Sequence, residues 1–316
     1  MTVATILITG GAGFIGSHLC ERFINDGHGV VCVDNFLSGS RDNLTLLATS
    51  KKCTIIEHDV CQPLPELPKL DAILHFASPA SPNPHSPVSY VNHPVETIMV
   101  NTLGTQRLLE LAKSNKCQII LASTSEVYGD PVVHPQPETY WGNVSSTGVR
   151  SCYDEGKRAM EALAFAYFRL GAAHVKVVRI FNTYGPRMRL DDGRFMPNLV
   201  QAILSGTSFP LFGSGDSTRS FCYIDDLIEG IMQIFTTSAS IGKVINLGNP
   251  QEYALVDVIK LAEKISEQKL KIESRPALAD DPKRRCPDIS LARDLLGWEP
   301  KISLEQGLTS MLKSYR

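Results

Sequence analysis

The chain has 316 residues, with 33 Asp and Glu against 31 Lys and Arg. This length allows one large domain or two tightly joined domains, with a sizeable core. The formal net charge of −2 and the pI of about 6.5 leave no basic excess for nucleic acid or an anionic membrane surface. No apolar run is long enough to span a bilayer, so we expect neither a nucleic-acid nor a membrane partner.

The cysteines and the start of the chain bear on location. The 8 cysteines show no C-x-x-C spacing and no clustering with histidine, so we expect reduced thiols and no metal site. The first predicted strand begins almost at Met1, which leaves no room for a signal or transit peptide. Both features favour a cytoplasmic location.

The first predicted elements form a strand–turn–helix unit. The apolar run at 4–9 predicts a buried strand, Gly10, Gly13 and Gly16 follow it, and a helix is expected at 17–25. Glycines at this spacing permit a tight turn, a close approach of the backbone to a pyrophosphate, and close packing of helix on strand. The helix N-terminus offers N–H groups to phosphates. The segment therefore predicts a dinucleotide-binding loop.

The second predicted strand, 29–34, ends in an acid. The Asp34 carboxylate can accept hydrogen bonds from both hydroxyls of an adenosine ribose, and it would repel a 2′-phosphate. We therefore predict NAD rather than NADP as the cofactor.

Strand-like runs and helical stretches continue to alternate along the chain. Such βαβ alternation implies a doubly wound (Rossmann) α/β fold, with a parallel sheet covered on both faces. The Pro-rich stretch 79–94 is expected as a loop over the carboxyl ends of the strands, where ligands bind. Further strands are predicted at 53–59, 71–77, 118–123, 175–181 and 244–247, and helices at 91–114 and 153–170.

After residue 182 the pattern changes, because Gly and Pro interrupt 184–215 and a second loop covers 275–288. We predict an NAD-binding Rossmann domain built from 1–181 and 221–248. A smaller C-terminal substrate domain is expected from 182–220 and 249–316, interleaved with the first. Its predicted helices lie at 255–268, 291–295 and 304–313.

Two segments carry candidate catalytic groups. Tyr153 and Lys157 are four residues apart and share a helix face. We expect the Lys charge, with a positively charged nicotinamide close by, to lower the pKa of the Tyr toward neutrality. Such a Tyr can remove a proton from a sugar hydroxyl while hydride leaves the same carbon. Thr124 and Glu126 lie at the end of the fifth predicted strand and face the same side. The Thr hydroxyl would steady the Tyr.

These motifs, together with 181–186, resemble the extended short-chain dehydrogenases/reductases that act on nucleotide sugars. The likeness covers nearly the whole chain and is greatest to the UDP-glucuronate decarboxylase branch. The matching segments are 80–82, 123–131, 138–143, 148–158, 190–194, 218–223, 287–288 and 296–300.

The resemblance implies further site residues. Asp59 and Val60 would flank the adenine, and Asn182 would touch the sugar diphosphate. Three arginines would bind the diphosphate, the uridine ribose or the substrate carboxylate, since guanidinium groups suit both kinds of anion. Arg150 would order its own loop. The three arginines are Arg194, Arg219 and Arg285, and the remaining expected cofactor contacts are Phe14, Ile15, Asn35, Ala77 and Asn101.

The activity implied is decarboxylation of UDP-glucuronate to UDP-xylose through C4 oxidation, loss of carbon dioxide and re-reduction by a bound NAD. Glu126 and Arg285 would place the carboxylate and manage the C5 proton. The alternatives are a 4-epimerase or 4,6-dehydratase of the same family, or a non-catalytic NAD-binding regulatory protein. Ser125 stands where the dehydratases have an acid, which weakens that alternative. A homodimer through 91–114 and 153–170 is also expected.

Overall fold

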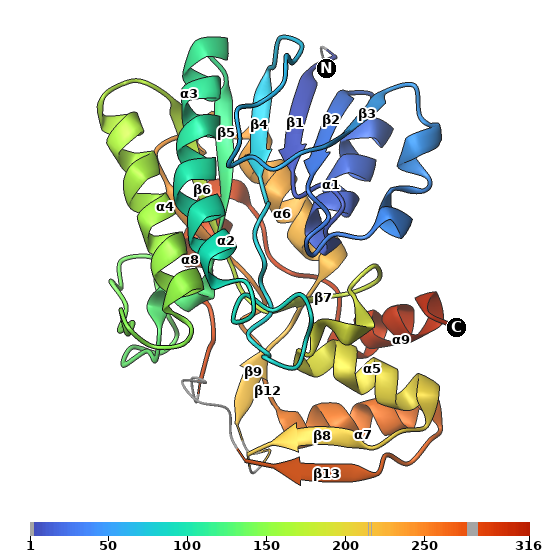
Figure 1. Cartoon of the computed structure of the whole chain (residues 1–316). Coiled ribbons are helices and arrows are strands. Elements are labelled where there is room, and N and C mark those ends of the chain that lie inside the picture. The colour runs from blue at the N-terminus through green and yellow to red at the C-terminus, as the bar shows by residue number, and fades with distance from the viewer. Residues whose placement is uncertain (1–2, 214, 216, 277–283) are drawn as a thin grey trace.

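Figure 1 shows the computed structural model, which describes residues 3–213, 215, 217–276 and 284–316. The predicted loop at 275–288 therefore lies partly outside the described residues, since 277–283 are not among them.

The centre of the molecule is a seven-stranded sheet in the order β11-β6-β5-β4-β1-β2-β3. Every neighbouring pair in it is parallel, which confirms the predicted doubly wound fold. The chain turns from one half of the sheet to the other between β1 and β4, the switch point at which open α/β sheets bind ligands. The strands are β1 Thr5–Thr9, β2 Gly29–Asp34, β3 Cys53–Glu57, β4 Ala72–His75, β5 Gln118–Thr124, β6 His174–Ile180 and β11 Val244–Leu247.

Helices cover both faces of the sheet (Figure 1), so successive strand residues are buried on opposite sides. Ile6 and Ile8 belong to the apolar cluster of α1 and α6, whereas Leu7 belongs to that of α3 and α4. This two-sided burial explains why the strands read as continuous apolar runs. The helices are α1 Phe14–Asn25, α2 Pro94–Met99, α3 Thr105–Asn115, α4 Ser151–Arg169, α5 Phe195–Ser205, α6 Ile224–Thr236, α7 Leu255–Ser266, α8 Ser290–Leu296 and α9 Leu304–Ser314.

Helices α2 and α3 replace the single helix predicted at 91–114. A π-helical turn, Val100–Gly104, joins them. Two further helices, α5 and α6, were not predicted. Pro197 falls in the first turn of α5, where a missing N–H costs nothing, so the Pro that suggested a loop is compatible with the helix. None of the helices that the structure describes has the length and apolar character needed to cross a bilayer.

A smaller layer lies beyond the carboxyl edge of the sheet, where α5 and α7 pack with short strand pairs (Figure 1). Parallel pairs join β7 to β10 and β8 to β13, and an antiparallel pair joins β9 to β12. The cavity described next opens between this layer and the main sheet. The strands are β7 Thr183–Tyr184, β8 Phe209–Phe212, β9 Thr218–Ser220, β10 Cys222–Tyr223, β12 Glu252–Ala254 and β13 Ile272–Arg275.

Candidate active site

A cavity of about 640 Å³ lies at the carboxyl ends of the parallel strands. Its lining combines the glycine turn, the strand ends, the loop after β4 and the beginning of α5. All but one of the predicted site residues line it. They are Gly10, Gly13, Phe14, Ile15, Gly16, Asp34, Asn35, Asp59, Val60, Ala77, Thr124, Glu126, Tyr153, Lys157, Asn182, Arg194, Arg219 and Arg285.

The glycine turn is built without side chains for steric reasons. Gly10 has a φ of +72°, and a Cβ there would lie 2.6 Å from the Ala77 nitrogen. A Cβ on Gly16 would overlap the carbonyl oxygen of Gly10. Gly13 is the N-cap of α1 and makes no side-chain cap hydrogen bond, and the first residues of the helix, 14–16, line the cavity. This cradle fits the diphosphate of a dinucleotide.

Asp34 lies at the end of β2 with 7% of its surface exposed. Its two carboxylate oxygens accept hydrogen bonds from the backbone N–H groups of Ala12, at 2.9 Å, and Phe36, at 2.8 Å. Burial raises the pKa of Asp34, and these two hydrogen bonds oppose the rise. Each oxygen keeps a further lone pair for a ribose hydroxyl, as the predicted preference for NAD requires.

Asn101 is the predicted cofactor contact that does not line the cavity. It is fully buried in the π-helical turn, and its amide nitrogen donates to the Ser78 hydroxyl at 3.0 Å and to the Thr97 carbonyl at 2.8 Å. Among the described residues its amide oxygen has no hydrogen-bond partner. Ser78 does line the cavity, so Asn101 is one hydrogen bond away from the lining.

Tyr153, Lys157 and Thr124 lie together where α4 packs against the end of β5. Tyr153 and Lys157 are 7% and 3% exposed. The Lys157 ammonium donates to the Ala122 carbonyl at 2.7 Å and lies 5.7 Å from the centre of the Tyr153 ring. A hydrogen bond joins the Thr124 hydroxyl to Tyr153, as the sequence predicts.

Burial has the largest effect on the protonation of this pair. Burial raises the pKa of Tyr153, while the Thr124 hydrogen bond and the charge of Arg194 lower it. Burial also lowers the pKa of Lys157 to about 7, against an opposing effect of Glu161. Burial is thus the largest effect on both groups in the protein by itself. The expected lowering of the Tyr153 pKa includes the charge of a bound nicotinamide and stays a prediction.

Glu126 is held between two arginines. The Arg285 guanidinium donates to one carboxylate oxygen at 2.7 Å, and Arg150 is paired with the other. The Arg285 segment is placed by Gln136, which is fully buried and whose side-chain oxygen accepts the Cys286 N–H at 2.9 Å. The sequence prediction gave Arg150 only a loop-ordering function and did not include Gln136.

Tyr90 is a further neighbour of the site that the sequence did not reveal. Its ring stacks on Tyr153 with centroids 4.8 Å apart and an interplanar angle of 2°. The Cys152 thiol donates to the Tyr90 carbonyl at 3.6 Å, so the loop that carries Tyr90 is held to the first turn of α4. Tyr90 lies in an irregular loop, where the sequence has no helix or strand periodicity that would indicate which residues face the site.

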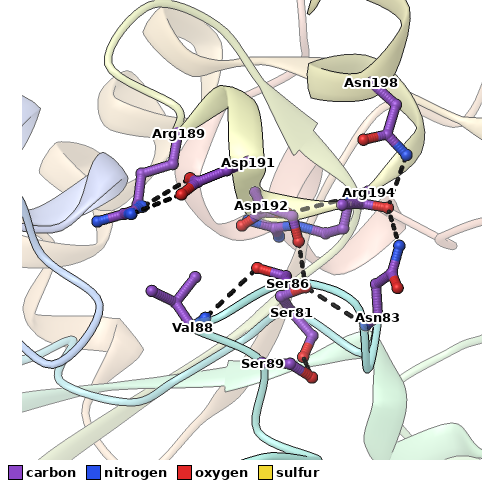
Figure 2. Close-up of polar contacts among 11 residues, drawn as sticks. Ser81, Asn83, Ser86, Val88, Ser89, Arg189, Asp191, Asp192, Arg194 and Asn198 are labelled. Atoms are coloured by element: carbon purple, nitrogen blue, oxygen red, sulfur yellow. Dashed lines mark hydrogen bonds and ion pairs between the residues drawn. The ribbon is translucent and has the colours of Figure 1, made fainter.

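The same loop is also held to the chain before α5. Figure 2 shows that the Ser81 hydroxyl donates to the Asp192 carbonyl, and that the Asn83 amide donates to the Gly193 carbonyl at 2.9 Å. Arg194 is paired with the Asp192 carboxylate in the same group of contacts. The Arg194 guanidinium therefore reaches the cavity from a segment that these contacts hold to the loop after β4.

The other two predicted substrate contacts, Asn182 and Arg219, also line the cavity. Asn182 accepts the Cys222 N–H through its carbonyl at 2.9 Å, which directs the chain between β6 and β7 along the cavity. Arg219 lies on β9, and its guanidinium donates to the Thr218 carbonyl at 2.8 Å.

Outside the cavity lining, the possible ligand atoms of His134, Glu252 and Cys286 lie within 4.8 Å of one another. His134 lies 2.9 Å from the Glu252 carboxylate, and Arg284 lies 3.6 Å from it. A guanidinium so close to the carboxylate opposes the binding of a cation. Within this group the Glu252 carboxylate is hydrogen-bonded to His134 and paired with Arg284.

Comparison with known proteins identifies the family. The model of the NAD dependent epimerase/dehydratase family matches residues 6–248. UDP-glucuronic acid decarboxylase 4 of Arabidopsis thaliana is 46% identical over 314 residues, which are 99% of this chain and 69% of that relative. UDP-glucuronic acid decarboxylase 1 of Xenopus tropicalis is 45% identical over 311 residues, which are 98% of this chain and 72% of that relative.

Solved structures agree. The UDP-glucuronic acid 4-epimerase of Bacillus cereus, in complex with UDP-glucuronic acid and NAD, has a TM-score of 0.86 and 29% identity, with 98% of each chain covered. The UDP-glucose 4-epimerase of Thermotoga maritima, with UDP-glucose, has a TM-score of 0.87 and 27% identity, again with 98% of each chain covered. With its parallel sheet, its glycine turn and its Tyr–Lys pair, the chain therefore belongs to the NAD dependent epimerase/dehydratase family.

Proposed function

We propose that this protein is a UDP-glucuronate decarboxylase, which converts UDP-glucuronate to UDP-xylose and carbon dioxide. The observation that carries this is one cavity in which Tyr153 and Thr124 lie beside Glu126 and Arg285. The first pair suits oxidation at a sugar hydroxyl, and the second suits a carboxylate on the neighbouring carbon. The relatives named UDP-glucuronic acid decarboxylase, at about 45% identity over nearly the whole chain, support the proposal.

The first step is oxidation at C4. When bound, NAD supplies the acceptor of the C4 hydride and later returns it, so no net oxidant is needed. Tyr153 takes the proton of the C4 hydroxyl. The Thr124 hydrogen bond and the Arg194 charge oppose the effect of burial on its pKa, and the positive charge of NAD, when bound, would act in the same direction. Lys157 and Arg194 contribute positive charge nearby.

Loss of carbon dioxide follows, because the C4 ketone lies β to the C6 carboxylate. The C5–C6 bond breaks, and its electron pair comes to rest on the C4 oxygen as an enolate. Tyr153 and Thr124 donate hydrogen bonds to that oxygen. C5 then takes up a proton, and reduction of the ketone with return of the Tyr153 proton gives UDP-xylose. We assign the placing of the carboxylate and the handling of the C5 proton to Arg285 and Glu126.

We also propose that 182–220 and 249–316 form the sugar-nucleotide side of the cavity, with 1–181 and 221–248 forming the NAD side. Arg194 and Arg219 then serve the diphosphate or uridine. A homodimer and a cytoplasmic location complete the proposal. All 8 cysteines are free thiols, as expected for a reducing compartment.

The test is to incubate purified protein with UDP-glucuronate and to measure carbon dioxide and UDP-xylose by mass. We expect both products, and we expect UDP-glucose and UDP-galactose to be poor substrates because they lack the carboxylate. Conversion of UDP-glucuronate to its 4-epimer without carbon dioxide would instead favour the epimerase activity named for the Bacillus cereus neighbour. That outcome would reject the decarboxylase.

A further inference from the structure

The loop after β4 places a second aromatic ring against Tyr153. Tyr90 is fully buried, and its ring lies parallel to that of Tyr153, with centroids 4.8 Å apart and an interplanar angle of 2°. Tyr153 lines the cavity, whereas Tyr90 is not among the described residues that line it. Tyr90 therefore contacts the proposed base from outside the cavity lining.

The contact is made by the Tyr90 ring and not by its hydroxyl. Among the described residues, this buried hydroxyl has no hydrogen-bond partner. Burial raises the pKa of Tyr90, so the phenol is neutral at ordinary pH. A buried hydroxyl without a partner costs stability rather than adding to it. An offset stack of two aromatic rings is favourable, so the ring is the part of Tyr90 that supports the site.

The backbone of Tyr90 is held on both sides of the residue. Its N–H donates to the Ser81 carbonyl at 3.0 Å, and its carbonyl accepts the Cys152 thiol at 3.6 Å. Cys152 precedes Tyr153 in the first turn of α4. The Tyr90 ring is therefore fixed relative to the helix turn that carries Tyr153.

The same loop is joined to the segment that carries Arg194. The Ser81 hydroxyl donates to the Asp192 carbonyl (Figure 2). The Asp192 carboxylate is paired with Arg194, one of the predicted substrate contacts. Ser81 thus bonds both to the residue that stacks on Tyr153 and to the segment of a cation expected to bind the substrate.

We propose that Tyr90 is a positioning residue, which holds the Tyr153 ring in the orientation that proton removal from the C4 hydroxyl requires. The inference rests on the function proposed for Tyr153. Thr124 holds the Tyr153 hydroxyl through one hydrogen bond, which does not by itself fix the plane of the ring. A ring stacked on a fully buried partner cannot tilt without losing that contact. Since reacting atoms must lie about 3–3.5 Å apart and aligned, a tilted base lowers the rate more than substrate binding.

The test compares Tyr90→Leu, which removes the stacked ring, with Tyr90→Phe, which keeps it. Steady-state kcat and KM for UDP-glucuronate are measured. The rate constant of carbon dioxide release is also measured in a single turnover with a saturating excess of enzyme, where it does not depend on the fraction of inactive protein. Tyr90→Leu should lower kcat and this rate constant roughly tenfold or more, with KM changed by less than about threefold. Tyr90→Phe should stay within about twofold of the wild type in all three.

A matched control separates this function from general packing. Phe23 is also fully buried, lies with its ring centroid 4.9 Å from that of Phe235, and is not among the described residues that line the cavity. Phe23→Leu should lower the free energy of unfolding, because it too removes a buried ring, and should leave the single-turnover rate constant unchanged. Tyr90→Met, which keeps more side-chain volume but no ring, carries the test if Tyr90→Leu does not fold.

Three results would overturn the inference. An unchanged single-turnover rate constant in Tyr90→Leu would show a structural function alone. A loss in Tyr90→Phe as large as that in Tyr90→Leu would assign the function to the hydroxyl. A rise in KM with kcat kept would make Tyr90 a substrate contact. If the wild type forms the 4-epimer without carbon dioxide, the decarboxylase proposal fails by itself, and the rate constant of epimer formation then tests Tyr90.

Discussion

Tyr153 shows how much of the chemistry depends on single residues around one hydroxyl. Tyr90 stacks on its ring, Thr124 binds its oxygen, and the charges of Arg194 and Arg150 lower its pKa against the larger effect of burial. The neighbours of Tyr153 therefore set both where the base lies and how readily it loses its proton.

The first prediction removes the Tyr153 hydroxyl. Tyr153→Phe keeps the ring and its stack on Tyr90, so we expect the fold and NAD binding to persist while turnover falls roughly a hundredfold or more. Steady-state rates and the NAD content of the purified variant check this. Near-full activity would reject the proposed base.

The second prediction concerns cofactor choice at Asp34. Asp34→Asn removes the negative charge beside the ribose, so we expect binding of NADP to improve relative to NAD. Dissociation constants for both cofactors check this, and heat-denatured wild type should release NAD. Tighter binding of NADP than NAD by the wild type would contradict the assignment.

The third prediction follows from the pKa of about 7 for Lys157, against 10.5 for an ordinary lysine. Below pH 7 the folded state bears the full cost of a buried charge. As pH rises toward 10.5, only the unfolded state remains charged, and this cost is progressively lost. The free energy of unfolding of cofactor-free wild type should therefore rise relative to Lys157→Met by about 1 kcal/mol per pH unit from pH 7 to 9. Urea unfolding of both proteins at three pH values measures it. Parallel pH dependences would show that Lys157 stays charged.

At the scale of elements, the cavity depends on irregular segments held to regular ones. The loop after β4 is held to α4 through Tyr90 and Cys152, and to the start of α5 through Asn83. The 285–288 segment is held by an isolated parallel bridge between Gln136 and Pro287. These contacts bring side chains from distant parts of the chain to the end of β5.

The fourth prediction tests how the Gln136 side chain holds the 285–288 segment. Gln136→Leu leaves the Cys286 N–H without its acceptor, which costs about 1–3 kcal/mol and loosens Arg285. We expect KM for UDP-glucuronate to rise several-fold while NAD binding is kept. Gln118→Leu is the control, since Gln118 begins β5 at the end away from Thr124 and its side chain donates a 3.4 Å hydrogen bond to the Phe235 carbonyl. An unchanged KM in Gln136→Leu would show that Arg285 is placed by other contacts.

At the scale of the whole molecule, one sheet with two covered faces carries the glycine turn and the Tyr–Lys helix, and the smaller layer closes the cavity (Figure 1). Helix α2 leaves Ile98 38% exposed outside the cavity lining, whereas its neighbours Val95 and Met99 line the cavity. Helix α2 lies within the stretch 91–114 and packs on α4, and these are the two helical stretches expected at a dimer interface.

The fifth prediction is a homodimer of about twice 34.7 kDa by light scattering. Ile98→Glu should shift it toward monomer, because a charge in an apolar interface is costly. Leu46→Glu, at a residue 73% exposed and away from α2, is the control and should leave the mass unchanged. A monomer at every concentration would contradict the dimer.

The sequence by itself determined the features that depend on neighbouring residues. The seven strands, the glycine turn, the acid at the end of β2 and the Tyr–Lys spacing are each read within one short segment, because turn sterics and periodic burial act locally. Some elements were missed on the same scale, helix α6 among them. The π-helical turn interrupts a regular pattern, and Pro197 in α5 reads equally well as a loop.

Only the tertiary structure decided which distant groups meet. Tyr90 on Tyr153, and Arg150 and Arg285 on Glu126, join segments between 24 and 159 residues apart along the chain. The pKa of Tyr153 likewise depends on how completely the fold removes it from water, and burial there is a larger effect than the Thr124 hydrogen bond and the charge of Arg194. Contact across the fold and desolvation are properties of packing, and no local pattern in the chain encodes them.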